Sequence, residues 1–130
     1  MPGNTYDTPT DVEGTYATPT YTTLSSDTPE YSSVVDANGS DGVKFELRID
    51  WDTSPTDGIY IEVVENLDGT FDGDEIPIFA MRVDAPASVV ETFHTITIPN
   101  VEHCRLKITQ TGTTDSHDFA ARAVKYRKVA

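Results

Sequence analysis

The sequence predicts an all-β protein: an antiparallel β-sandwich or jelly roll with an extended N-terminal arm. From about residue 31 onward, short runs of alternating apolar and polar residues are separated by clusters of Gly, Pro, Asn and Asp. About six or seven such runs in one domain are typical of sandwiches and jelly rolls. The first 30 residues lack this alternation and are rich in Thr, Pro and Tyr. We therefore divide the chain into an arm, residues 1–30, and a β-sandwich domain, residues 31–130.

The arm carries Thr-Pro pairs at a spacing of ten residues, at 8–9, 18–19 and 28–29. Each proline removes a backbone donor and pushes the preceding threonine toward extended backbone, so no helix is expected here. The arm is too polar to form a core. It is either a disordered tail or an extended arm that crosses a neighbouring subunit and is anchored by its tyrosines. The candidate anchors are Tyr6, Tyr16, Tyr21 and Tyr31.

The clearest strand of the domain is residues 43–51, where apolar and polar residues alternate without exception. Period-two alternation places one set of side chains on a buried face, here Val43, Phe45, Leu47, Ile49 and Trp51. Further strands are expected at 59–65, 78–83, 89–98 and 101–109, with a Gly/Asp-rich loop at 67–77. In the last of these strands, Cys104, Leu106 and Ile108 point inward and His103, Arg105 and Lys107 point outward.

The final segment, residues 119–129, is harder to assign. Its Ala-rich start favours a helix by propensity, but the neighbouring strands need an edge partner, so we favour a strand. It holds the basic residues Arg122, Lys125 and Arg127, our candidate acceptors for the acidic arm. No Lys or Arg precedes Lys44. The acidic and basic ends, of one copy or of different copies, would then meet in an assembly; the alternative is an ordinary solvated surface.

Composition excludes several classes of partner. The chain has 130 residues and a formal net charge of −13, so it repels phosphate groups and no nucleic acid is expected to bind. No apolar run approaches the roughly 20 residues of a membrane helix, and residues 1–4 do not begin a signal peptide.

The single cysteine, Cys104, excludes an intrachain disulfide framework. We expect it to be a small core residue.

No catalytic motif is present. The histidines, His94, His103 and His117, do not form a His-Glu-x-x-His pattern, and there is no nucleophile elbow or Gly-rich phosphate loop. We therefore expect no enzymatic activity and no cofactor. Two binding roles stay open. Exposed tyrosines, of which Tyr60 and Tyr126 are candidates, would suit a carbohydrate, whereas Trp51 is expected in the core.

The other open role is calcium binding in the loop that contains Asp68, Asp72 and Asp74. Closely spaced carboxylates with flexible glycines supply the oxygen ligands that calcium prefers. An EF-hand is rejected because position 12, counted from Asp68, is Phe79 instead of a glutamate. The remaining choices are a looser calcium site and an ordinary hairpin loop.

The motifs also follow a recognisable order. An alternating strand ends in Trp51, a Ser-Pro-Thr-Asp-Gly turn follows at 54–58, and the next strand leads into Asn-Leu-Asp-Gly at 66–69. The run Cys-Arg-Leu-Lys-Ile-Thr-Gln-Thr-Gly at 104–112 and a closing strand complete the pattern. This order, over residues 40–128, resembles small β-sandwich virion structural proteins of tailed bacteriophages.

The resemblance implies a non-enzymatic structural protein of a virion, assembled in the host cytoplasm. Such proteins decorate or cement the capsid exterior as homo-oligomers and contact the major capsid protein or other virion proteins, or they are components of the neck or tail. The alternative from the residues alone is a calcium- or carbohydrate-binding β-sandwich module.

Overall fold

The computed structural model describes residues 3–71, 75–88 and 90–129, which form eleven β-strands and no helix. None of the described residues form a helix with the length and apolarity that a membrane crossing requires. In chain order the strands are β1 (Asn4–Tyr6), β2 (Thr10–Glu13), β3 (Thr22–Leu24), β4 (Glu30–Tyr31), β5 (Val35–Asp36), β6 (Gly42–Asp50), β7 (Ile59–Glu65), β8 (Ile76–Val83), β9 (Glu91–Pro99), β10 (His103–Gln110) and β11 (His117–Lys128).

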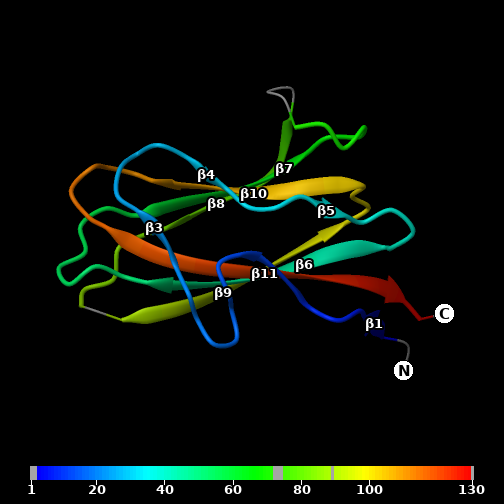
Figure 1. Cartoon of the computed structure of the whole chain (residues 1–130), viewed down its shortest axis with the longest axis horizontal. Coiled ribbons are helices and arrows are strands. Elements are labelled where there is room, and N and C mark those ends of the chain that lie inside the picture. The colour runs from blue at the N-terminus through cyan, green and yellow to red at the C-terminus, as the bar shows by residue number, and fades with distance from the viewer. Residues whose placement is uncertain (1–2, 72–74, 89, 130) are drawn as a thin grey trace.

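The strands form two antiparallel sheets that face each other (Figure 1). The first sheet has the order β1-β11-β6-β9, with β2 and β3 also paired to β11. The second has the order β4-β10-β7-β8, with β5 also paired to β10. The predicted all-β sandwich is confirmed.

The core lies between the two sheets, and period-two alternation explains which residues enter it. In β6, the side chains from Val43 to Ile49 at every second position are almost fully buried, and Trp51 follows them into the core at 3% exposure. In β10, Cys104, Leu106 and Ile108 are buried, as expected for strands with one face on the core. The final segment is the strand β11 rather than a helix, also as predicted.

Residues 3–36, called the N-terminal segment below, cover one side of the sandwich. Its first three strands lie along β11, from Asn4 opposite Lys128 to Leu24 opposite His117. The chain then crosses to the second sheet, where β4 and β5 lie along β10. Three of its side chains, Val12 at 6% exposure, Leu24 at 1% and Val35 at 8%, belong to the core. The N-terminal segment is therefore extended, and it lies on its own chain.

Several strand boundaries differ by one or two residues from the sequence prediction, among them the starts of β8, β9, β10 and β11. β8 begins at Ile76 instead of residue 78, because a bulge between Val63 and Val64 lets the irregular stretch around Pro77 pair with β7. β9 begins at Glu91 instead of residue 89, and Val89 lies outside the described residues.

Candidate interaction surfaces

A cluster of arginines and tyrosines joins the N-terminal segment to the outer face of the first sheet. A short hairpin between β2 and β3 turns at Gly14, whose φ of 57° and close approach to Thr20 leave no room for a side chain. The hairpin places Tyr16 over two arginines, with its ring centre 4.3 Å from Arg122 Cζ and 5.7 Å from Arg48 Cζ. These are cation–π distances.

Arg48 also links this hairpin to β9. Its Nη1 donates to the backbone oxygen of Tyr16 at 2.7 Å, and its Nη2 donates to Glu91 Oε1 at 2.7 Å. Hydrogen bonding to Glu91 raises the pKa of Arg48, and the same hydrogen bond lowers the pKa of Glu91. The Tyr21 hydroxyl donates to the other Glu91 oxygen. Burial of Tyr21, with this hydrogen bond, raises its pKa to about 12.

The other two candidate anchors also contact their own chain. Tyr6 lies 6.1 Å from the ring of Tyr126, and the Lys44 ammonium lies 5.4 Å from the Tyr6 ring centre. Tyr31 is on the second sheet, where its ring lies 4.1 Å from Arg105 Cζ. The structure thus gives each of the four predicted tyrosines a partner within the chain, and their role between copies stays a prediction.

Of the three predicted basic acceptors, only Arg122 has a side-chain contact with a predicted tyrosine among the described residues. Lys125 and Arg127 meet the N-terminal segment through the backbone. The Lys125 carbonyl accepts the N–H of Asp7 at 2.9 Å, and Arg127 lies opposite Thr5 in the ladder of β1 and β11.

The side of the sandwich opposite the N-terminal segment is open. Neither β8 nor β9 has a second strand partner among the described residues. Several apolar side chains are exposed along or near this side: Leu67, Ile76, Ile78, Val90 and Phe93. β8 carries Pro77 and faces the bulge in β7, two features that blunt an edge against further pairing. β9 has neither feature before its last residue, Pro99.

A buried polar network holds two loops together at one end of the sandwich. His117 is fully buried, and its Nδ1 accepts the N–H of Asp52 at 3.1 Å. The ring proton is therefore on Nε2, which donates to the Asp57 carbonyl at 2.8 Å and lies 3.2 Å from Asp115 Oδ2. Burial alone would raise the pKa of Asp115, but N–H donors from Asp57 and Thr56 outweigh burial and lower it. Because the ring is fully buried and both of its nitrogens are hydrogen-bonded to the backbone of Asp52 and Asp57, His117 holds the two loops together.

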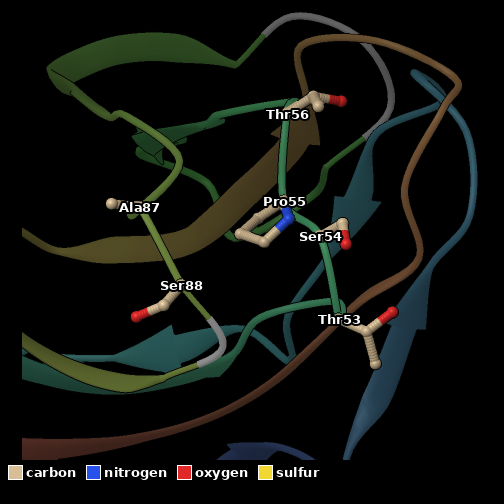
Figure 2. Close-up of a pocket in the computed structure, with 6 residues that line it drawn as sticks. All are labelled: Thr53, Ser54, Pro55, Thr56, Ala87 and Ser88. Carbon is tan, nitrogen blue, oxygen red and sulfur yellow. The ribbon is translucent and has the colours of Figure 1, made fainter.

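A broad hollow on the surface adjoins this network. Figure 2 shows the loop at 53–56 facing the loop at 87–88 across it. The hollow measures about 610 Å³ and is lined by Thr53, Ser54, Pro55, Thr56, Ala87 and Ser88. The lining contains hydroxyl groups and no titratable side chain. The hollow is therefore an open depression between two loops.

The structure describes only part of the predicted calcium loop. Asp68 Oδ1 accepts the N–H of Thr70 at 2.8 Å in a tight turn. Asp72 and Asp74 lie outside the described residues, so the calcium site stays a prediction. Within residues 3–71, 75–88 and 90–129, the structure brings no group of three or more acidic, His or Cys side chains together as metal ligands.

The two tyrosines considered for a sugar differ in exposure. Tyr60 is 39% exposed on the outer face of the second sheet, whereas Tyr126 is 4% exposed. Tyr126 was expected at the surface and is buried, because Tyr6 and the start of β6 cover it. Near Tyr60, a hollow of about 190 Å³ on the same sheet is lined by Tyr31, Glu62, Val64, Glu75, Pro77 and Lys107.

Sequence comparison finds no matching protein-family profile and no matching curated protein. Structure comparison finds proteins with the same fold. One is a protein of Bacillus endospore appendages, described as forming disulfide-linked pili, with a TM-score of 0.53 and 10% identity over 98% of this chain and 90% of that chain. Another is xylanase 10B of Clostridium thermocellum, solved as CBM22-1 and GH10 modules with xylohexaose, with a TM-score of 0.52 and 16% identity. That match covers 96% of this chain but 26% of the xylanase.

At these identities the comparisons establish the β-sandwich fold alone.

Sequence reasoning missed the network around His117. One signal was available: the inward positions of β10 continue past Ile108 to Gln110, which is fully buried. A buried amide requires hydrogen-bonding partners, and Gln110 Nε2 donates to the Asp115 carbonyl at 2.7 Å. The alternation therefore indicated a polar network at the end of this strand.

Proposed function

We propose that the chain is a non-enzymatic structural protein of a virion, of the kind that decorates or cements the capsid of tailed bacteriophages. In this proposal, copies join by exchanging the first part of the N-terminal segment, residues 3–24. The observation that supports it is the way these residues are held. They cover the edge of β11 as three short, mostly exposed strands, and only Val12 and Leu24 enter the core.

Exchange of an identical element between copies preserves every contact that the element makes, so it needs little free energy. The stretch at 25–29 that follows β3 is well placed to act as the hinge, because it is largely exposed and ends in Pro29. In the exchanged form, strand pairing on β11 of a neighbour supplies affinity, and the contact of Tyr16 with Arg122 adds selectivity.

The fold comparison is compatible with such a role. The endospore appendage protein with the same fold is described as forming pili, which are assemblies of repeated subunits. Disulfide bonds of the kind described for that protein would not link copies of this chain. Its single cysteine, Cys104, is fully buried, and burial raises the pKa of the thiol to about 12.

The partners in this proposal are further copies of the chain and the major capsid protein or another virion protein, and the location is the assembled particle. A neck or tail position is the alternative within the same proposal. Mass spectrometry of purified particles, with imaging of where the chain lies, is the direct test. Particles that lack the chain would contradict the proposal.

Exchange itself is tested by a disulfide across the pair Thr23 and Asp118, which lie opposite each other in β3 and β11. The double variant Thr23→Cys, Asp118→Cys is oxidised at high protein concentration and run on a non-reducing gel. Exchange gives covalent dimers or larger species, whereas a segment that stays on its own chain gives only monomers. The single variant Thr23→Cys is the control, and Cys104 is too buried to interfere.

A carbohydrate-binding module is a second candidate, favoured by the hollow on the second sheet that brings Tyr31 together with Glu62 and Lys107. An aromatic ring with flanking polar groups suits a sugar. Xylo-oligosaccharides at millimolar concentration would then raise the melting temperature by mass action, and Tyr31→Ala would abolish the rise. No rise with xylo-, cello- and chito-oligosaccharides would contradict this role.

A further inference from the structure

We infer that the edge strand β9 docks onto β9 of a second copy, giving a symmetric dimer in which the first sheet continues across a twofold axis. This inference rests on the self-association proposed above and assigns it a surface separate from the N-terminal segment. In Figure 1, β9 lies at the margin of its layer, on the far side of β6 from β11.

The backbone of β9 is arranged for such pairing. Trp51 N–H donates to the Val90 carbonyl, and Asn100 N–H donates to the Asp41 carbonyl, at the two ends of the ladder of β6 and β9. The register between them has no shift. Since hydrogen-bonded pairs alternate along an antiparallel ladder, the even-numbered residues of β9 bond to β6. Phe93, Thr95 and Thr97 therefore direct their N–H and C=O groups outward, to the open edge.

The side chains of β9 do not protect this edge. Natural edge strands avoid pairing through lysines, prolines, bulges or short length, and β8 uses Pro77 and the bulge opposite it. β9 spans nine residues, and its only formally charged side chain, Glu91, is paired with Arg48. Phe93 is 58% exposed beside the edge. An unpaired strand of this kind is an association site.

A second β9 fits this edge better than other segments of the chain. In the antiparallel register that pairs all nine residues of the two β9 strands, the twofold axis passes through Thr95. Thr95 of one copy then lies opposite Thr95 of the other. Phe93 lies opposite Thr97, an aromatic and β-branched pair that favours pairing, and Glu91 lies opposite Pro99, so no like charges meet. The outward backbone groups of both copies coincide in this register, except that Pro99 has no N–H to donate to the carbonyl of Glu91. Strands of the N-terminal segment would bring further carboxylates and are already paired with β11.

Single-cysteine variants test the register. In the centred register, Thr95→Cys places two thiols opposite each other, at about 5.5 Å between Cα atoms, whereas Thr97→Cys faces Phe93 of the partner. We expect oxidation to convert Thr95→Cys into a covalent dimer and to leave Thr97→Cys mainly monomeric. The pair Phe93→Cys, Thr97→Cys should cross-link again. Equal cross-linking of Thr95→Cys and Thr97→Cys, or none by either, overturns the inference.

Thr95→Lys tests the energetics, because it places two ammonium groups opposite each other at the twofold axis. Analytical ultracentrifugation should show that the dimer dissociation constant rises by about tenfold or more, a change of about 1.4 kcal/mol per tenfold. Thr113→Lys makes the same substitution at an exposed loop position and should leave the constant unchanged. Added salt should strengthen the dimer of the unaltered chain, because each copy carries a net charge of −13.

The outcomes separate this inference from the proposed function. Association that persists in Thr95→Lys, with covalent exchange across Thr23 and Asp118, overturns the β9 contact and leaves the structural role intact. A chain that is monomeric at all concentrations and absent from particles overturns both. Loss of the dimer in Thr95→Lys alone supports the β9 contact.

Discussion

The ring of Tyr16 lies over the guanidinium group of Arg122, with 4.3 Å between the ring centre and Arg122 Cζ. Arg122 Nε also donates to Glu46 Oε1 on β6 at 3.0 Å. One arginine on β11 therefore holds the hairpin of the N-terminal segment on one side and the neighbouring strand on the other. Tyr16 and Arg122 thus meet within a single chain, and their role between copies stays a prediction.

Replacing this arginine should loosen the hairpin. Arg122→Ala removes a cation–π contact of about 0.5–1 kcal/mol and an ion pair of about 0.2–1 kcal/mol, so urea unfolding should show a loss of about 1–2 kcal/mol. Hydrogen exchange at Thr15 and Thr20, whose amides bond to each other's carbonyls, should become faster. Arg127→Ala, at an exposed position, is the control and should change stability by less than about 0.5 kcal/mol. Equal losses in both variants would contradict a specific role for Arg122.

Leu24 tests how firmly the N-terminal segment belongs to the fold. Because Leu24 is 1% exposed in the core, Leu24→Ala should cost about 2–5 kcal/mol in the free energy of unfolding, the range for a buried leucine. Val34→Ala shortens an apolar side chain of the same segment at an exposed position and should cost less than about 0.5 kcal/mol. Urea titration followed by Trp51 fluorescence would measure both. A negligible loss for Leu24→Ala would mean that the segment is detached in solution.

The strands with one buried face could be predicted from the sequence almost residue by residue. β7 has the predicted bounds, and the inward side chains of β6 and β10 are those that alternation selects. Burial of Trp51 and Cys104 follows from the same period. In these strands the burial of each side chain depends only on its position along the strand, so the sequence of the strand itself is enough to predict it.

The position of the N-terminal segment could not be predicted in this way. Its strands have two to four residues each, too short for alternation to show, and most of their side chains are exposed. Their partners, β10 and β11, lie far along the chain, and charge alone did not decide between pairing within a copy and between copies. The network around His117 was missed for a related reason, because it joins two loops that are remote in sequence.

The buried network makes His117 a strong stability determinant. His117→Leu leaves the Asp52 N–H and the Asp57 carbonyl without their ring partners, and each buried unsatisfied group costs about 1–3 kcal/mol. A total loss of about 3 kcal/mol in urea unfolding is expected. His94→Leu is the control, because His94 is only partly buried and its ring bonds to the Thr92 hydroxyl. A loss no larger than that of His94→Leu would show that the network contributes little.

Two aspartates at the end of β6 should respond to pH in opposite ways. Burial and the nearby Glu91 and Asp118 raise the pKa of Asp50, so its charge destabilises the fold above that pKa. Asp50→Asn should therefore raise the free energy of unfolding at pH 7 by less than about 1 kcal/mol, since the group is partly exposed, and so raise the melting temperature. The difference should vanish as pH falls below the unfolded value of about 3.9.

Asp52 is the matched comparison. Hydrogen bonds from the Ser116 and Thr53 amides lower its pKa, so its charge stabilises the fold above the unfolded pKa, and this contribution is lost as pH falls through the folded pKa. Asp52→Asn should lower the melting temperature at pH 7 and have little effect in strong acid. Melting curves of both variants from pH 3 to pH 8 would show the opposite signs, and parallel curves would contradict this assignment.

The pairing of β1 with β11 sets the order of events on the ribosome. Asn4 and Leu24 are synthesised early, yet their partners, Lys128 and His117, emerge nearly a full chain length later. Contacts so distant in sequence slow folding, because a long loop must close before they form. Until the last residues are made, the early strands therefore lack the strand β11 on which they pair, and β11 of a copy finished on a neighbouring ribosome of the same message can receive them first.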